Sequence, residues 1–120
     1  MYTEKIIEHF KNPKHAGEIK NPDAIGQEGN PQCGDIMKIF LKIKDNRITD
    51  VKFKTFGCIA AIATSDMLCE LAKGKIIEEA LALTPKDIIN SLGDMPPIKH
   101  HCSLLGIKAL KNAITDYKTK

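Results

Sequence analysis

Two of the four cysteines in this chain stand beside side chains that bind metals or transfer protons. Asp35 follows Cys33 by two positions, and His101 directly precedes Cys102. Thiolate sulfur with one oxygen or nitrogen donor is typical of zinc sites and iron–sulfur clusters. A thiol beside a base is also typical of nucleophilic catalysis. A shared metal site requires the cysteines to meet in the fold, so the elements that carry them decide how plausible it is.

Hydrophobic periodicity predicts seven elements. They are a helix over 3–11, two strands over 36–44 and 48–56, a helix over 59–73, a short helix over 76–83, a helix from 85 to about 93, and a helix over 103–117. The two strands alternate apolar and basic residues on either side of Asp45 and Asn46, which indicates an antiparallel hairpin. This order predicts an α+β domain with helices packed on one face of a small antiparallel sheet.

The cysteines other than Cys69 fall at the ends of these predicted elements. Cys33 precedes the hairpin, Cys58 lies where a strand passes into a helix, and Cys102 stands at the start of the last helix. Unpaired N–H groups and the dipole at a helix N-terminus favour a thiolate, which binds metal and attacks sulfur. Gly34 and Gly57 leave room beside the thiols. The pattern favours a shared metal site, although any one of these cysteines alone would be an ordinary packing residue.

Cys69 is expected to differ from the other three cysteines. It follows Cys58 by 11 positions, about 16 Å along a helix axis, so the two cannot share one metal. It falls on a stripe with Asp66 and Lys73, away from the predicted apolar face. We therefore expect a partly exposed thiol without a role in the site.

Composition predicts one ordinary globular domain spanning residues 1–120. The net charge of +3 decides little about partners. The strand lysines alternate with apolar residues, so they predict a solvated strand face, and we expect no nucleic-acid binding. Charged residues near the N-terminus and the lack of a long apolar run predict neither a signal peptide nor a membrane span. We expect a cytoplasmic protein whose cysteines stay reduced.

Three motifs carry a resemblance to a known family. The runs NPQCGD, FKTFGCIAAIATS and MPPIKHHCSLLG occur in this order, and the likeness extends over nearly the whole chain. They resemble the iron–sulfur cluster assembly scaffolds of the IscU type, which are equivalent to the N-terminal domain of NifU. The resemblance implies a sheet of about three strands with helices on one face. It also implies a set of metal and cluster ligands formed by Cys33, Asp35, Cys58, His101 and Cys102.

The resemblance further implies a scaffold and carrier rather than an enzyme. Such a protein assembles a [2Fe–2S] cluster from iron and from persulfide sulfur that a cysteine desulfurase of the IscS or NifS type supplies. Cys102 or Cys33 would accept the persulfide sulfur. An electron donor such as a ferredoxin would reduce it, apo iron–sulfur proteins would receive the cluster, and a homodimer is compatible with bound cluster. Zinc would suit the same ligands in the isolated protein.

The segment before the last helix resembles a chaperone-binding motif. Met95, Pro96, Pro97, Ile98 and Lys99 are similar to the LPPVK segment through which these scaffolds engage an Hsp70-type chaperone and its co-chaperone. Alternatively, the prolines only hold the chain extended before the helix.

Three other functions remain open from the sequence. One is a zinc-binding sulfur acceptor of the SufU type, although the insertion that marks that branch is absent between Cys58 and Cys102. A second is a thiol enzyme with Cys102 as nucleophile and His101 as base, which is weakened because adjacent residues rarely align for that proton transfer. The third is a purely structural zinc module.

Overall fold

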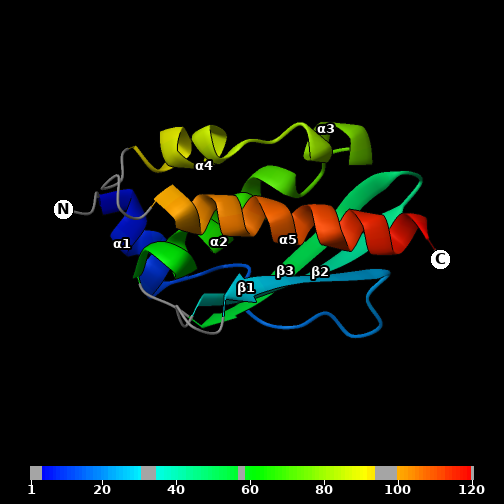
Figure 1. Cartoon of the computed structure of the whole chain (residues 1–120), viewed down its shortest axis with the longest axis horizontal. Helices are drawn as coiled ribbons and strands as arrows, with labels where there is room; N and C mark the ends of the chain where they lie inside the picture. The colour runs from blue at the N-terminus through cyan, green and yellow to red at the C-terminus, as the bar shows by residue number, and fades with distance from the viewer. Residues whose placement is uncertain (1–3, 31–34, 57–58, 94–99, 120) are drawn as a thin grey trace.

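A computed structural model describes residues 4–30, 35–56, 59–93 and 100–119 of the chain. Three strands and five helices occur in these ranges (Figure 1). In chain order they are α1 (Glu4–Lys11), β1 (Ala24–Asn30), β2 (Asp35–Lys44), β3 (Arg47–Phe56), α2 (Ile59–Ala72), α3 (Ile77–Leu81), α4 (Pro85–Leu92) and α5 (His100–Lys118). The predicted α+β class is confirmed.

The sheet is antiparallel in the order β1-β2-β3. The predicted hairpin is present, and Asp45 and Asn46 form its turn with φ of 53° and 64°. Short polar side chains tolerate this left-handed region, which matches the twist of a two-residue hairpin. Strand β1 was not predicted from periodicity, because its sequence AIGQEGN has glycines where an ordinary strand has apolar residues. Its existence agrees with the expected total of about three strands.

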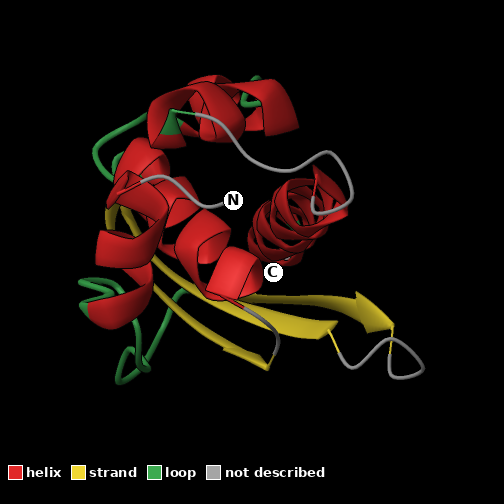
Figure 2. Cartoon of the chain, turned by 90° about the vertical axis from the view of Figure 1, so that its left-hand side faces the viewer, coloured by secondary structure: helices red, strands yellow, loops and turns green. Residues whose placement is uncertain are grey.

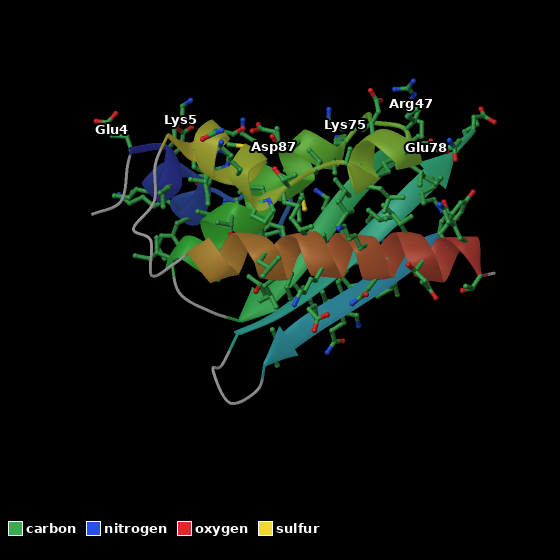
Figure 3. The ribbon with its side chains drawn as sticks, turned by 45° about the horizontal axis from the view of Figure 1, so that its top comes forward. Glu4, Lys5, Arg47, Lys75, Glu78 and Asp87 are labelled. Carbon is green, nitrogen blue, oxygen red and sulfur yellow. The ribbon has the colours of Figure 1, made fainter. Side chains whose placement is uncertain are left out.

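The helices cover one face of the sheet (Figure 2). Along β2, Met37, Ile39 and Leu41 face the helices and are fully buried. Lys38, Phe40 and Lys42 alternate with them and therefore face the other way. Residues 12–23 reach the opposite side of the sheet. There the Nζ atoms of Lys52 and Lys42 donate to carbonyl oxygens of this segment, at 3.3 and 2.7 Å. The lysine-bearing face is therefore partly covered by the protein's own chain.

Helix α2 is the central helix, because it contacts α1, β3, α4 and α5. Helix α4 begins as predicted, with Thr84 at the N-cap and Asp87 completing a capping box. Helix α5 lies along β1 and β2 and begins at His100, three residues before the predicted start. The functional motifs flank these elements, so the positions of their ends decide whether the motifs can meet.

Candidate metal centre

The motif containing Cys33 and the motif containing Cys58 meet at one end of the sheet. Asn30 at the end of β1 pairs with Asp35 at the start of β2. Ile36 pairs with Phe56 at the end of β3. Cys33 lies in the chain between Asn30 and Asp35, and Cys58 follows Phe56 by two positions, but both cysteines lie outside the described residues. The described backbone on both sides of Cys33, and that before Cys58, therefore reaches the same end of the sheet.

Helix α5 starts at that same end of the sheet. It runs antiparallel to β1, since Asn112 Nδ2 donates to the Gln27 carbonyl at 2.9 Å and the Ile25 N–H donates to Asp116 at 3.3 Å. In Figure 1 the arrowhead of β1 and the first turn of α5 accordingly lie on the same side of the molecule. The first turn of α5, which belongs to the third motif, therefore lies at the same end of the sheet as the elements that flank the other two motifs.

Close packing fixes the distance between α5 and the sheet near this end. A Cβ at Gly106 would lie 3.1 Å from Leu68 Cδ2 and 3.5 Å from Met37 Sδ, so the helix backbone rests almost directly on α2 and β2. Met37 is two residues from Asp35, and Gly106 is about one helical turn from Cys102. The Ser65 hydroxyl donates to Met37 Sδ at 3.3 Å. These contacts pack the region beside the predicted site tightly, and they hold the first part of α5 at a fixed distance from the sheet.

The start of α5 also provides hydrogen-bond donors. Cys102 is the third residue of the helix, so its N–H is among the first four that lack an intrahelical acceptor. Such groups, together with the helix dipole, stabilise a nearby negative charge. They would stabilise a thiolate in the first turn of the helix.

The ligand assignment itself stays a prediction. Asp35 begins β2 and His101 lies in the first turn of α5, but the side chains of Asp35, His101 and Cys102 are outside the described part, as are all atoms of Cys33 and Cys58. Within the residues that the structure does describe, no three His, Cys, Asp or Glu side chains gather as a metal site. The chaperone-like segment from Met95 to Lys99 also lies outside the described residues.

The expectation that Cys69 is partly exposed was wrong. Cys69 is fully buried in the core. Periodicity failed here because α2 is covered on several sides rather than on one stripe. Burial raises the pKa of the Cys69 thiol well above its usual range, and the nearby Asp66 carboxylate raises it further. This cysteine is therefore a neutral packing residue, inert toward metal and persulfide.

Asp66, which was assigned to the polar side of the same helix, is also fully buried. Its Oδ2 accepts a hydrogen bond from His9 Nδ1 at 2.5 Å, and its Oδ1 accepts one from the His15 N–H at 2.9 Å. The His9 side chain is 15% exposed. Asp66 thus ties α1 and the following segment to the central helix. A lone carboxylate between Ser65 and Met67 in an apolar helix was the signal in the sequence for a buried, partnered acid.

The family of the chain follows from comparison with known proteins. The family model described as NifU-like N terminal domain matches residues 1–120. The chain belongs to this family. Among curated proteins, the chain is 54% identical over 120 residues to the iron-sulfur cluster assembly scaffold protein IscU 1 of Archaeoglobus fulgidus, covering 100% of this chain and 78% of that protein. It is 46% identical over 123 residues to the IscU scaffold protein of Escherichia coli strain K12, covering 99% and 95%.

Solved structures agree with the fold. A putative iron-sulfur cluster assembly scaffold protein for the SUF system from Fervidobacterium islandicum AW-1 superposes with a TM-score of 0.78 at 25% identity, covering 94% of this chain and 96% of that one. A NifU-like protein (N-terminal) from Brucella abortus gives 0.77 at 20% identity, covering 98% and 94%. The second likeness is evidence of fold alone. The family resemblance and the three-stranded α+β fold are thereby confirmed.

In the described ranges, no helix is long and apolar enough to cross a membrane.

Proposed function

We propose that this chain, as one domain over residues 1–120, is a scaffold on which an iron–sulfur cluster is built and from which it is passed to acceptor proteins. The match of the NifU-like N terminal domain family to the whole chain carries this proposal. The arrangement at the sheet end supports it, because the elements flanking the three motifs end at one edge. Cys33, Asp35, Cys58, His101 and Cys102 would supply the ligands for the cargo.

The donor set suits iron and sulfide chemistry. Thiolates prefer soft metals and iron–sulfur clusters, while one carboxylate and one imidazole add weaker ligands that an acceptor can displace. Zinc takes the same tetrahedral donors and would occupy the set in the absence of iron. The cluster is cargo, so its ligands must bind it firmly enough for assembly and release it afterwards.

Assembly of a [2Fe–2S] cluster requires a sulfur donor and electrons. A cysteine desulfurase of the IscS or NifS type would carry sulfane sulfur as a persulfide. The thiolate of Cys102 or Cys33 would attack that sulfur, forming a new S–S bond and releasing the desulfurase thiolate. Each persulfide needs two electrons to give sulfide. Two ferrous ions oxidised to ferric supply two of the four electrons for two sulfides, and a donor such as a ferredoxin would supply the other two.

Further partners follow from this role. Apo iron–sulfur proteins would receive the cluster, and a homodimer would be compatible with bound cluster. The Met95–Lys99 segment would dock an Hsp70-type chaperone with its co-chaperone. The protein would work in the cytoplasm, where reduced thiols persist. It would act as a carrier and not as an enzyme.

Anaerobic reconstitution tests the proposal. The purified chain is mixed with ferrous iron, cysteine, a reductant and a cysteine desulfurase, and the visible spectrum is followed. We expect a cluster absorption band that decays when an apo-ferredoxin is added, with matching appearance of the holo-ferredoxin spectrum. A chain that binds iron or zinc but gains no cluster band would contradict the proposal.

A zinc-binding sulfur acceptor of the SufU type is the second candidate. The structural likeness to the SUF-system protein fits it only in part, because that protein is described as a putative cluster assembly scaffold and is 25% identical, against 54% and 46% for proteins named IscU. The same reconstitution separates the two functions. A sulfur acceptor would gain persulfide from the desulfurase, detected by mass spectrometry, and pass it on without forming a cluster.

A further inference from the structure

An apolar groove of about 430 Å³ lies between α1, α2 and the outer edge of β3. Its apolar lining is formed by Phe10, Pro13, Ala16, Phe53 and Ile62. Phe10 remains 36% exposed, and Ile7, on the same face of α1, is 38% exposed. Large side chains left open around one hollow mark a surface that a partner covers.

Backbone hydrogen-bonding groups border this groove. On the outer edge of β3, the Phe53 N–H donates to the His15 carbonyl at 2.9 Å, and the Phe53 carbonyl accepts from the Gly17 N–H at 2.8 Å. Outward-facing groups recur at every second residue of an antiparallel strand, so the N–H and C=O of Thr55 project from the same edge. No described residue pairs with them, and Thr55 itself lines the groove. An extended chain laid here would find a donor and an acceptor beside an apolar hollow.

The rim of the groove is mainly basic. Lys11 and Lys14 are exposed next to the lining residues, and Lys54 lines the groove itself. The Lys54 ammonium ion holds Glu18 at 2.7 Å and lowers the pKa of that carboxyl. Both side chains of this pair are more than half exposed, so the pair is weak and another carboxylate can take the place of Glu18. The charge therefore favours a partner with acidic residues.

We propose that this edge is a docking site for an extended peptide segment of a partner protein, with one large apolar side chain flanked by acidic residues. The segment would add to β3 at Thr55 and place its apolar side chain against Phe10 and Ile62. Main-chain hydrogen bonds give affinity in this mode of recognition, and the pocket gives specificity. The proposal uses no metal ligand and does not depend on the function proposed above.

A designed peptide tests the site on the metal-free chain. The probe is a fluorescein-labelled peptide, EVELEVE, and its matched forms are KVKLKVK, EVESEVE and EVELEVE with an N-methylated leucine. Fluorescence anisotropy should show saturable binding of EVELEVE. The affinity of each of the other three peptides should be at least about tenfold lower. Bound peptide should slow hydrogen exchange at the Thr55 amide. The Lys54 amide, which faces β2, should keep its rate.

Matched variants locate the binding. Phe10→Asp should weaken binding of EVELEVE at least about tenfold, whereas Ile25→Asp should not, because Ile25 is 38% exposed but lies on β1 at the other edge of the sheet. Lys54→Glu should weaken binding, and Lys44→Glu, at the far end of β2, should not. Circular dichroism confirms that each variant is folded.

Three results would overturn the proposal. One is the absence of binding and of exchange changes at Thr55 at millimolar peptide. Another is an equal loss in the Phe10→Asp and Ile25→Asp variants. The third is a concentration-dependent dimer, seen by sedimentation, that Phe10→Asp dissolves and the peptide does not, which would assign the groove to a second copy of this chain.

Discussion

The core around Cys69 and the end of the sheet that the other three cysteine motifs flank differ in what they can offer a thiol. Helix α2 is enclosed by α1, β3, α4 and α5, and Cys69 is fully buried in its last turn with a raised pKa. In the sequence, the other three cysteines flank or begin elements (β1, β2, β3 and α5) whose termini lie at one end of the sheet. Burial disfavours a charged thiolate in the core, whereas the first turn of α5 has N–H groups without an intrahelical acceptor, which would stabilise a thiolate.

This contrast shows why the ends of helices and strands suit a site that must load and release cargo. A metal ligand in the middle of a packed helix would have to move core side chains to exchange its metal. A ligand in a loop or first helical turn can change position while the core stays intact. The core of this protein instead contributes rigidity, since Met37 and Leu68 hold the start of α5 against the sheet.

Removing single thiols should separate the two regions most sharply. Cys33→Ser, Cys58→Ser and Cys102→Ser should each abolish stable cluster assembly, because each removes a predicted sulfur ligand. Cys69→Ala should assemble cluster to the same level per folded molecule. Anaerobic reconstitution followed by visible absorbance measures both results.

Alanine is chosen at position 69 because a serine hydroxyl would be buried in the core without an assured partner. Thermal unfolding of Cys69→Ala supplies the control, since a cavity lowers stability without touching the ligands. Loss of the cluster from a fully folded Cys69→Ala protein would break the proposed division between the two regions.

The core should respond most strongly at Asp66. Asp66→Ala removes the acceptor of two hydrogen bonds and leaves His9 mostly buried without its partner, so we expect about 3–5 kcal/mol lower stability to unfolding by urea. Lys54→Ala is the matched control, since it breaks an exposed ion pair and should cost less than about 1 kcal/mol. Similar losses in both variants would mean that the buried pair stabilises no more than a surface pair.

Sequence reasoning succeeded where a local signal exists and failed where burial depends on the whole fold. The hairpin turn at Asp45 and Asn46 and the N-cap at Thr84 depend only on residues adjacent in the sequence, and both are present. Strand β1 was missed because its inward position is Gly26, chosen for close contact with α5 rather than for strand propensity. Cys69 was misplaced because no periodicity reveals that a helix is enclosed on several sides.

The predicted ligands show the converse limit. Their residue types and motifs could be identified in the sequence. The strands that flank Cys33 and precede Cys58 end at one end of the sheet, as a shared site requires. Their mutual geometry depends on loops and a first helical turn, where no periodic pattern restricts the side chains. The set therefore stays a prediction, and variants must test it.

The contact between α5 and β1 should be far less tolerant than the contact near the site. A Cβ at Gly26 would lie 2.2 Å from the Ala109 carbonyl oxygen and 2.3 Å from the Ala113 nitrogen, both backbone atoms. Gly26→Ala should therefore cost about 3 kcal/mol or more in urea unfolding, because the whole helix must shift.

Gly106→Ala is the comparison for that variant. Its new methyl group would press on the end of the Leu68 side chain, which can turn aside, and alanine favours the helix. We expect a change within about 1 kcal/mol. Equal costs at Gly26 and Gly106 would contradict the close backbone contact between α5 and β1.

The chaperone-like segment should matter for a partner and not for the cargo. Lys99→Ala should weaken binding to a cognate Hsp70-type chaperone roughly tenfold, the effect of losing one hydrogen bond from a charged group. Cluster assembly on the isolated chain should be unchanged. Isothermal titration with the chaperone and anaerobic reconstitution measure the two properties. Unchanged affinity would leave the prolines with only a structural role.

The smallest effect is expected at Asp35, and it should appear in release rather than in assembly. A carboxylate oxygen is a harder donor than a thiolate, so it should hold iron less firmly in a sulfur-rich site and can be protonated or displaced by water. Asp35→Ala should still form the cluster, but transfer to apo-ferredoxin should be slower and the visible band should last longer. Stopped-flow or manual absorbance after mixing with the acceptor measures this rate, and Asp35→Asn tests whether charge or mere polarity is needed. Transfer at the wild-type rate would remove Asp35 from the release step, while failure to bind any metal would make it an indispensable ligand.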